Sequence, residues 1–405
     1  MKILVVTSVF PNLKQPGLGV FVKERMFNVS RHSEIKVVAP VPWFPFIGLI
    51  KKGYRPRVDH LEIQDGIEVY HPRFFNFPGF LKSLDGFFFF LSIAYTVWKL
   101  RRRFDFDVID AHFAYPDGLG AVLLGRLFKR PVTVTVRGTI GKLSRYPLRR
   151  MQIRYALKKA ARVFSVCEDL KETATGLGIP GSKITVIENG VDIEKFRPVD
   201  KLEARRVLGL PLDRKIIISI GGLVERKGFH RVLSVLPEIK KAVPDVMYLI
   251  VGGASVEGDY EHALRKMVRG LNLEEDVVFA GPRPHDELYR WLSASDLFCL
   301  ATSNEGWANV FLEAFACGLP VVTTRVGGNF EVVSSDNYGL LFDLGDENGM
   351  KEAVIKALKK EWDTKMIINY ARENAWDGKV KKLCREFEET VNFYRRSAPD
   401  KAVTG

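Results

Sequence analysis

The first half of the chain alternates short β-branched apolar runs with longer stretches whose apolar residues recur at helical spacing. This alternation predicts buried strands and amphipathic helices in repeated βαβ units, and hence a parallel sheet. The predicted strands are Ile3 to Ser8, Ile35 to Ala39, Val108 to Ala111, Val132 to Val136, Val163 to Val166 and Ile184 to Ile187. The predicted helices are Phe21 to Ser30, Leu84 to Arg103, Leu119 to Phe128, Leu148 to Ala160 and Glu168 to Leu177.

The second half repeats the same alternation. Its predicted strands are Ile216 to Ile220, Val246 to Val251, Val277 to Ala280, Leu297 to Leu300 and Val321 to Thr323. Its predicted helices are Phe229 to Lys241, Tyr260 to Leu271, Asp286 to Ser293 and Asn309 to Cys317, the last closed by Gly318. A final amphipathic stretch carries apolar residues at helical spacing: Trp376, Val380, Leu383, Phe387 and Val391.

The two sets of elements meet at FRPVD, a polar stretch that contains a proline, so we place a domain boundary near Pro198. The predicted fold class is α/β, with two doubly wound, Rossmann-like domains at 1–198 and 199–375 and a ligand cleft between them. The segment 376–405 is predicted to return to the first domain as a helix.

Composition is consistent with two cores, since the chain has 405 residues of which 46% are apolar. Cys167, Cys299, Cys317 and Cys384 lie far apart without a CxxC pair, so neither a disulfide framework nor a zinc site is predicted. The chain opens on an apolar run, KILVVTSVF, without a leader of charged, apolar and small residues. We therefore expect a cytoplasmic protein.

The formal net charge of +13 favours an anionic partner, whether phosphate, acidic lipid or nucleic acid. The most apolar run, Phe87 to Trp98, is too short to span a membrane and is followed by Lys99 and Arg101 to Arg103. Two interpretations stay open: an interfacial helix that meets acidic lipid, or a buried domain helix whose terminal cations suit its dipole. An aromatic loop just before the run favours the first and holds Phe74, Phe75, Phe77 and Phe80.

The turn after the predicted strand IIISI reads GGLVERKGF. Gly221 and Gly222 allow the backbone to turn tightly beside a ligand, and Arg226 and Lys227 arrive just before a helix N-terminus, where free amides attract anions. Ligands of doubly wound sheets bind at the carboxyl ends of the strands. This turn therefore predicts a diphosphate site, with a loop carrying two solvated cations as the alternative.

A second turn, SNEGWANVFLEAFACG, follows the predicted strand LFCL. Glu305 lies in its loop, the amides from Gly306 to Asn309 face the incoming helix, and Glu313 lies inside that helix. A carboxylate accepts two hydroxyl hydrogen bonds at once, so the vicinal diol of a sugar or a ribose is a natural partner. A metal pair or an acid/base pair is the alternative, but no His or third carboxylate in the segment completes either. The same candidate site includes Trp307, Ala308 and Val310.

The first domain offers weaker candidates. Gly19 ends a glycine-rich loop that can approach a phosphate, but its spacing differs from the GxGxxG fingerprint, which argues against a dehydrogenase. His112 follows a strand, and a contact in the cleft and a structural loop histidine are equally open. Asp105 and Asp107 form a DxD pair at the amino end of a strand, so we interpret them as a solvated turn and not as a metal site.

The order and content of these turns resemble family 4 of the glycosyltransferases, retaining enzymes with the GT-B fold, over nearly the whole chain. EGWANVFLEA with CGLPVVTTRVGG resembles the E-x7-E element of that family, here Glu305 to Glu313, and GGLVERKG resembles its phosphate-binding turn. Further similar segments are PGLGVF, DVIDAHFAYPDG, VIENGVDIEKFRP and the tail that begins at Trp376.

The resemblance implies a nucleotide-diphosphate sugar as donor and retention of the anomeric configuration. It implies that Glu305 and the amides after it hold the donor hexose, and that Glu313 holds the ribose hydroxyls. Lys227 would pair with the diphosphate, which Gly19 and its neighbours approach from the opposite domain. We expect no metal and no cofactor besides the donor.

Two positions depart from the family. Many members carry Arg where this chain has Gly222, so either Arg226 supplies the second positive charge or the phosphate contact is weaker. Many members carry His where this chain has Arg137, and an acidic residue where it has Ile140. We take Arg137 as a candidate contact to phosphate or acceptor.

The expected reaction transfers a hexose to a glycan or lipid-linked acceptor in polysaccharide biosynthesis, in the cytoplasm or at the inner face of the membrane. Lys227, Arg226 and Arg137 would stabilise the leaving diphosphate. The rival interpretations are a sugar-nucleotide epimerase of similar fold and a catalytically weak relative that binds nucleotide or lipid. A nucleic-acid-binding protein is disfavoured, because basic residues are spread over both domains and no recognisable motif is present.

Overall fold

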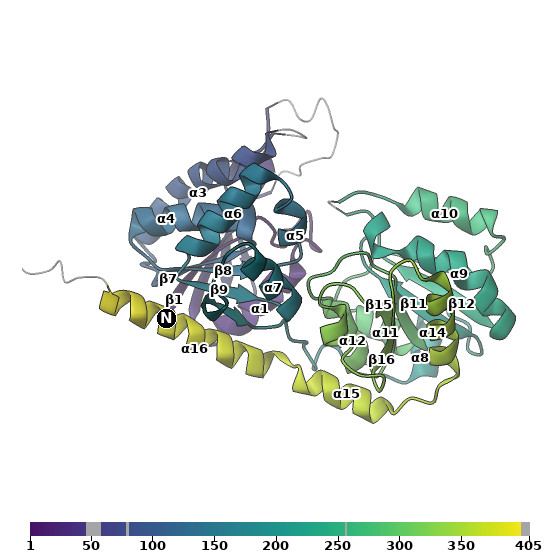
Figure 1. Cartoon of the computed structure of the whole chain (residues 1–405). Coiled ribbons are helices and arrows are strands. Elements are labelled where there is room, and N and C mark those ends of the chain that lie inside the picture. Colours follow the sequence, from purple (N-terminus) through teal and green to yellow (C-terminus); the bar gives the residue numbers. More distant parts are fainter. Residues whose placement is uncertain (46–57, 78–80, 256, 398–405) are drawn as a thin grey trace, which may run out of the picture. The chain divides into compact units, whose positions relative to one another are not determined.

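The computed structural model describes residues 1–45, 58–77, 81–255 and 257–397 (Figure 1). The chain divides into two units, Met1–Asn189 together with Asp377–Gly405, and Gly190–Trp376. Each unit contains its own large parallel β-sheet. Phe80, from the predicted aromatic loop, lies outside the described residues.

The first unit is built on an eight-stranded sheet in the order β10-β9-β8-β7-β1-β2-β5-β4. All neighbours are parallel except β4 and β5, which form an antiparallel pair at one edge. The strands are β1 (Lys2–Val6), β2 (Glu34–Val38), β4 (Leu61–Gln64), β5 (Ile67–Tyr70), β7 (Val108–His112), β8 (Val132–Val136), β9 (Arg162–Ser165) and β10 (Ile184–Val186). A separate parallel pair consists of β3 (Val41–Trp43) and β6 (Arg73–Phe75). Strands β7 and β8 are buried throughout, as expected for a sheet covered on both faces.

Helices cover the first sheet. They are α1 (Val20–Ser30), α3 (Asp85–Arg101), α4 (Leu119–Phe128), α5 (Ile140–Leu143), α6 (Pro147–Lys159), α7 (Glu168–Gly176) and the C-terminal α16 (Trp376–Ser397). The predicted C-terminal helix is confirmed: the side chain of Phe387 in α16 packs edge-to-face on Phe164 of β9, with ring centroids 5.6 Å apart. Glu386 of the same helix accepts a hydrogen bond of 2.8 Å from Nε of Arg162. The end of the chain therefore completes the unit in which the chain begins.

The second unit contains a six-stranded sheet in the order β13-β12-β11-β14-β15-β16, parallel throughout. The strands are β11 (Lys215–Ile220), β12 (Val246–Val251), β13 (Val277–Gly281), β14 (Leu297–Leu300), β15 (Val321–Thr324) and β16 (Gly339–Phe342). The helices are α8 (Lys201–Leu208), α9 (Phe229–Ala242), α10 (Glu261–Gly270), α11 (Leu288–Ser293), α12 (Asn309–Ala316), α13 (Asn329–Val332), α14 (Glu347–Lys359) and α15 (Thr364–Glu373).

The direction in which strands are added reverses at β1 in the first sheet and at β11 in the second. This reversal is the topological switch point of doubly wound sheets, where ligands bind beyond the carboxyl ends of the strands. In the second unit, Gly221 directly follows β11 and Ala301 directly follows the neighbouring β14. The predicted fold class, with two Rossmann-like sheets and a C-terminal helix, is confirmed.

The segment 190–198, assigned from the sequence to the first domain, lies in the second unit. Val191 and Phe196 are buried in the apolar core of that unit. A Cβ atom on Gly190 would lie 2.7 Å from the backbone nitrogen of Trp376, so the two ends of the second unit run close together. The core of the second unit thus already includes residues before Pro198, among them Phe196 of the FRPVD stretch.

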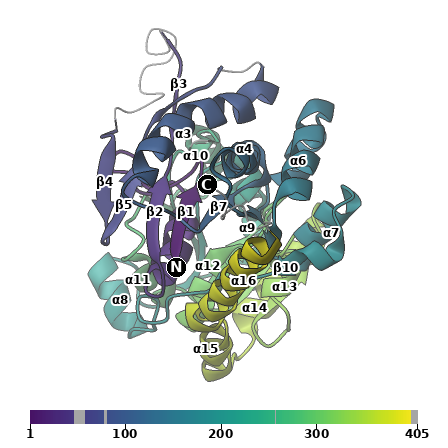
Figure 2. The same cartoon turned by 90° about the vertical axis from the view of Figure 1, so that its left-hand side faces the viewer.

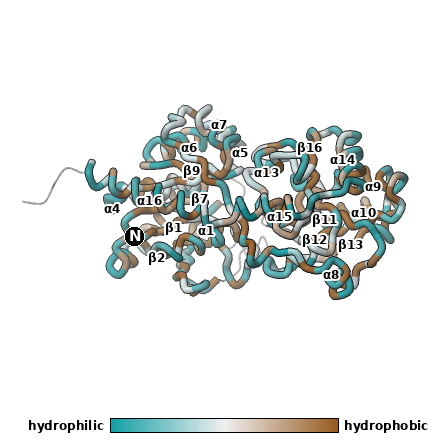
Figure 3. The backbone as a smooth tube through the Cα atoms, turned by 90° about the horizontal axis from the view of Figure 1, so that it is seen from below, coloured by the Kyte–Doolittle hydropathy of each residue, from teal (hydrophilic) through white to brown (hydrophobic). Residues whose placement is uncertain are grey.

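Hydrophobic residues follow the strands inside each unit and mix with hydrophilic ones along α16 (Figure 3). The buried apolar residues accordingly lie on the strands of both sheets, and in the second unit they form two clusters. Among the described helices, none is both long and apolar enough to cross a membrane.

Candidate functional site

The loop after β11 brings two cations to a carboxylate of the neighbouring loop. Nζ of Lys227 and Nη1 of Arg226 both contact Oε1 of Glu305, the latter at 3.1 Å. Arg226 also forms a two-point ion pair with Glu257, which raises the pKa of the guanidinium above its ordinary value. The structure thus brings together three of the residues selected from the sequence, at the switch point of the second sheet.

The backbone of Gly327, in the turn after β15, packs directly against the backbone of Glu305. Gly327 has a φ of +52°, and a Cβ atom there would lie 1.8 Å from the carbonyl oxygen of Glu305. A side chain at 327 would therefore displace the loop. The hydroxyl of Thr302 lies 3.4 Å from Oε1 of Glu305 and 3.1 Å from the carbonyl oxygen of Arg226, so its one proton has a choice of acceptors.

The residues after Glu305 lead into α12, which begins at Asn309 without a side-chain cap from Ala308. The first-turn amides of a helix are orphan donors that attract anionic or hydroxyl groups. Trp307 and Val310 are partly buried against the core of the second unit, so they anchor this loop. Gly306 is buried in the same loop.

Glu313, in the second turn of α12, is only 6% exposed. Its Oε1 lies 3.0 Å from Nε2 of His285, and Nδ1 of His285 lies 2.7 Å from Nζ of Lys195. Because a lysine ammonium can only donate, Nδ1 accepts and the ring carries its proton on Nε2, directed at Glu313. The ring also packs edge-on against Phe196, with centroids 5.1 Å apart. Neither His285 nor Lys195 was selected from the sequence, although Lys195 lies in the VIENGVDIEKFRP segment.

The glycines after β11 have different surroundings. Gly221 lies against the aliphatic part of Lys227, at 3.7 Å from a Cβ position to Cε. Many family members carry Arg at the position of Gly222. A Cβ atom on Gly222 would lie 3.0 Å from Cβ of Ser255, so Ser255 leaves little room for a side chain at this position. Arg226 is the second cation of this loop in the structure.

In the first unit, His112 and Arg137 are neighbours at the carboxyl ends of β7 and β8. Nη2 of Arg137 lies 3.1 Å from Nδ1 of His112, and Nε2 of His112 lies 3.1 Å from Oδ2 of Asp110. The arginine can only donate, so Nδ1 accepts and the proton lies on Nε2. Complete burial lowers the pKa of His112 to about 4, so the ring is neutral near pH 7.

Further buried charges surround this pair. Burial lowers the pKa of Arg137 well below its ordinary value and that of Arg25, on α1, to about 10. Burial raises the pKa of Asp117 to about 7, and its Oδ2 accepts a hydrogen bond of 2.9 Å from the amide of Ser8. Perturbed titratable groups gather at functional sites, which makes this cluster a candidate. Asp110 could have been noticed as a charge inside an apolar strand, and Asp117 as part of the AYPDG segment.

Gly19 precedes α1 with a φ of +69°, and a Cβ atom there would lie 2.7 Å from the carbonyl oxygen of Val9. The glycine is therefore required by the backbone itself. Whether it also approaches a phosphate stays a prediction.

The DxD pair lies at the amino end of β7, opposite the end that carries His112. Asp105 pairs with Nη2 of Arg130 at 2.7 Å, and Asp107 accepts a hydrogen bond of 2.8 Å from the amide of Lys2. The side chain of Asp105 is 64% exposed and that of Asp107 is 24% exposed, so both carboxylates reach solvent and also form ion pairs or backbone contacts.

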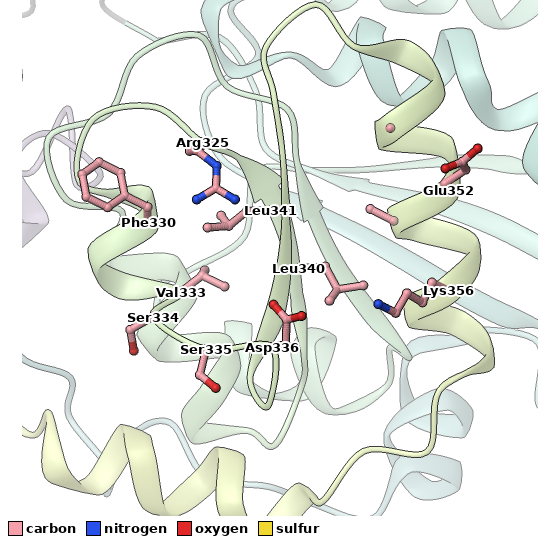
Figure 4. Close-up of a pocket in the computed structure, with 12 residues that line it drawn as sticks. Arg325, Phe330, Val333, Ser334, Ser335, Asp336, Leu340, Leu341, Glu352 and Lys356 are labelled. Carbon is pink, nitrogen blue, oxygen red and sulfur yellow. The ribbon is translucent and has the colours of Figure 1, made fainter.

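A surface pocket of about 530 Å³ lies elsewhere in the second unit, between α13, β16 and α14 (Figure 4). Its lining mixes charges of both signs, including Arg325, Asp336 and Lys356. The residues selected from the sequence do not line it. We therefore base the site on the cluster of Lys227, Arg226 and Glu305.

Comparison with known proteins gives the same assignment for both units. Residues 200–374 match the family model "Glycosyl transferases group 1", and residues 48–195 match "Glycosyltransferase Family 4". The chain is 30% identical to TuaC of Bacillus subtilis (strain 168), described as a teichuronic acid biosynthesis glycosyltransferase, over 81% of this chain and 82% of TuaC. It is 27% identical to an N-acetyl-alpha-D-glucosaminyl L-malate synthase of Bacillus anthracis, over 74% of this chain and 77% of that protein.

Solved structures are similar over the full length. Anabaena HepE in complex with UDP has a TM-score of 0.71 at 20% identity, covering 96% of this chain and 100% of HepE. Sucrose-phosphate synthase of Thermosynechococcus elongatus has a TM-score of 0.76 at 18% identity, covering 97% of this chain and 100% of the synthase. These likenesses give the fold, which is GT-B, and the sequence matches give the family: the chain belongs to family 4 of the glycosyltransferases.

Proposed function

We propose that this enzyme transfers a hexose from a nucleotide-diphosphate sugar to a glycan or lipid-linked acceptor, with the donor bound by the second unit. The observation that carries the proposal is the contact of Lys227 and Arg226 with Glu305 at the switch point of the second sheet. Two relatives add support: TuaC is described as acting in teichuronic acid biosynthesis, and HepE was solved with UDP and with UDP-glucose. A UDP-sugar is accordingly the first donor to test.

The proposed roles follow from charge and position. Lys227 and Arg226 neutralise the diphosphate, Glu305 and the amides after it bind hydroxyls of the hexose, and Glu313 binds the ribose. Lys227 then exchanges or shares its partner, because the same ammonium that contacts Glu305 meets the phosphate. We assign the acceptor to the first unit, where His112 and Arg137 are the candidate contacts.

We infer a same-face reaction. The bond between the anomeric carbon and the phosphate oxygen breaks, the acceptor oxygen bonds to that carbon on the same face, and the acceptor proton passes to the departing phosphate oxygen. The two cations stabilise the negative charge that develops on the diphosphate, which is the kind of preorganised electrostatic contribution that dominates many enzymes. We assign this task to side chains and not to a metal ion. A trapped covalent glycosyl-enzyme would contradict the scheme.

We place the reaction in the cytoplasm. The cysteines of the chain are free, and Cys167, Cys299 and Cys317 are buried. Free thiols without a disulfide framework suit a reducing compartment.

The first prediction concerns donor and site together. In a panel of UDP-, GDP- and ADP-sugars assayed for release of nucleoside diphosphate, we expect turnover of one donor with a suitable acceptor. Lys227→Ala and Glu305→Gln should each lower that turnover by about 10²- to 10³-fold, the usual loss for one preorganised charge. Addition of a chelator should leave the rate unchanged.

Lys266→Ala is the matched control, since Lys266 is an exposed lysine on α10 of the same unit. Full activity of Lys227→Ala would contradict the assignment. Conversion of the sugar nucleotide without any acceptor would indicate an epimerase, and nucleotide binding without transfer to any acceptor would indicate a catalytically weak relative.

A further inference from the structure

Helix α3 has two apolar faces, of which only one is covered. The inner residues are buried in the first unit: Phe89, Ile93, Val97 and Leu100. On the outer face Phe87, Leu91, Tyr95 and Trp98 are 51%, 50%, 61% and 46% exposed. These four positions are three or four residues apart, so they form one stripe along the helix. The segment is therefore a domain helix on one side and an exposed apolar surface on the other.

The stripe ends in aromatic rings flanked by cations. Tyr95 and Trp98 stack, with ring centroids 6.1 Å apart and an interplanar angle of 21°. Nζ of Lys99 lies 4.6 Å from the Tyr95 ring, and the guanidinium of Arg102 lies 4.1 Å from the Trp98 ring. Aromatic rings beside long cationic side chains suit the boundary between an apolar phase and charged headgroups.

The positive charge of the chain belongs to the first unit alone. Met1–Asn189 and Asp377–Gly405 hold 37 Lys and Arg against 20 Asp and Glu, a net charge of +17, and Gly190–Trp376 holds 24 against 28, a net charge of −4. Basic residues are present in both units, as expected, but only in the first do they exceed the acidic ones. Residues 85–167, from α3 to just past β9, hold 16 basic against 5 acidic residues and so contribute +11.

Part of this charge lies on α3 and on the helices that follow it in the same layer. Helix α3 packs against α4, and α4 packs against α6, so the three helices form one layer, which we call the α3–α6 layer (Figure 2). On α6, Leu148 and Met151 are exposed beside Arg150 and Arg154. The sequence from 118 to 167 contains no Asp or Glu at all. The layer therefore combines exposed apolar side chains with cations that lack acidic neighbours in sequence.

We propose that the α3–α6 layer docks on the surface of a lipid bilayer that contains anionic lipids. The stripe of Phe87, Leu91, Tyr95 and Trp98 enters the headgroup region, and the lysines and arginines of the layer pair with lipid phosphates. Charge alone would equally suit a soluble polyanion, but an anionic polymer gives no reason for an exposed apolar stripe on α3. The proposal does not depend on which donor or acceptor the enzyme uses.

The test is flotation of the full chain with vesicles of phosphatidylcholine containing 30% phosphatidylglycerol, and with vesicles of phosphatidylcholine alone. We expect binding to the anionic vesicles that weakens with salt. The double variant Leu91→Gln/Trp98→Gln should bind about tenfold or more weakly, because two buried apolar side chains are lost from the membrane contact. The triple variant Arg102→Gln/Arg150→Gln/Arg154→Gln should bind about a hundredfold more weakly, at about fivefold per cation.

Two matched controls separate docking from damage. Trp98→Phe keeps an apolar ring, so it should bind as the parent does while losing the part of the fluorescence quenching by brominated lipid that Trp98 contributes. Lys266→Gln/Lys356→Gln/Lys365→Gln removes the same number of exposed charges from the second unit and should leave binding unchanged. Circular dichroism and thermal unfolding of each variant report whether it is folded.

The outcomes are distinct. Binding that only the stripe and layer variants lose supports the proposal. Absence of vesicle binding, equal binding to neutral vesicles, or binding that Leu91→Gln/Trp98→Gln leaves unchanged would overturn it. Retention on heparin that depends on the arginines, without vesicle binding, would show that the partner is an anionic polymer.

Discussion

Glu305 is held by two cations through a single oxygen, and this arrangement decides what a donor must do on binding. Lys227 and Arg226 are neutralised by carboxylates of their own unit, since Arg226 also pairs with Glu257. An incoming diphosphate therefore competes with protein carboxylates for its cations. We expect the gain to come from exchange of partners, so that the orientation of Glu305 affects both the phosphate and the hexose.

The contact between His285 and Glu313 predicts how loss of the histidine affects donor binding. His285→Ala removes the donor that orients the carboxylate proposed for the ribose, and the Michaelis constant for the donor should rise about tenfold, as for loss of one hydrogen bond to a charged group. Because the reacting atoms are not touched, kcat should change little. Steady-state kinetics and calorimetric titration with the bare nucleoside diphosphate measure the two effects.

His285→Gln, which retains an amide donor, should recover part of the affinity. His262→Ala on the exposed side of α10 is the matched control. A fall in kcat at constant Michaelis constant would place His285 at the chemistry instead of at the ribose.

His112 predicts a pH dependence of stability in the first unit. Its folded pKa of about 4 lies below the ordinary 6.5, so its contribution is present above about pH 6.5 and is lost as the pH falls through 4. The loss between pH 7 and 4.5 is about 2 to 3 kcal/mol. His112→Gln should remove this part of the acid sensitivity, as measured by urea unfolding at the two pH values.

Asp117 changes the stability of the first unit with pH in the opposite direction. Its folded pKa of about 7 is raised, so its contribution is present at low pH and is lost as the pH rises through 7. Asp117 is present in both proteins, so its effect cancels in the comparison of parent and His112→Gln. Equal acid sensitivity of the two proteins would mean that His112 is more accessible to protons than its burial indicates.

The sequence predicted those site residues whose position follows from local order alone. Arg226, Lys227 and Glu305 come just after strands, and parallel strands bring such turns to one edge of the sheet. His285 and Lys195 could not be found in this way, because their contact joins the segment before α8 to the loop before α11 and depends on tertiary packing. Asp117 could have been selected, since it lies in the AYPDG segment that resembles the family. Its burial, however, cannot be predicted from the sequence.

Most of the predicted strands and helices match the structure to within a few residues, but α14 and α15 were missed together with several shorter elements. The hairpin of β4 and β5 turns at Asp65 and Gly66, a dipeptide typical of tight hairpins, so the signal was present. Helix α8 also carries a recognisable start, because Asp200 accepts a hydrogen bond from the amide of Glu203. Both signals were overlooked, although LEIQ and IEV on either side of the turn alternate apolar and polar residues.

Helix α3 illustrates why one sequence pattern left two interpretations open. Four consecutive phenylalanines, 87–90, cannot all face the same side of a helix. In the structure Phe89 is fully buried and Phe87 is half exposed, so the run serves the core and the surface at once. Only the position of the helix on the sheet shows which face is which.

At the scale of the whole molecule, the two units carry net charges of opposite sign, +17 and −4. The first unit therefore attracts anions at long range and the second repels them. The unit proposed to bind the anionic donor carries the negative net charge, so attraction to the donor must come from the local cations Arg226 and Lys227. The unit to which we assign the acceptor carries the long-range positive field. Salt should therefore weaken membrane docking more than donor affinity, since the donor contact is partly buried and less screened.

Because α16 packs on the first unit, we predict that a core substitution in α16 lowers the stability of that unit and not of the second. Phe387 is fully buried against Phe164, so Phe387→Ala should destabilise the first unit by about 3 to 5 kcal/mol through the cavity it leaves. Calorimetry should show two transitions, of which one moves down by about 6 to 20 °C. Phe393→Ala is the matched control, since Phe393 on the same helix is 73% exposed and its loss should move neither transition. Equal shifts of both transitions would mean that the two units unfold as one.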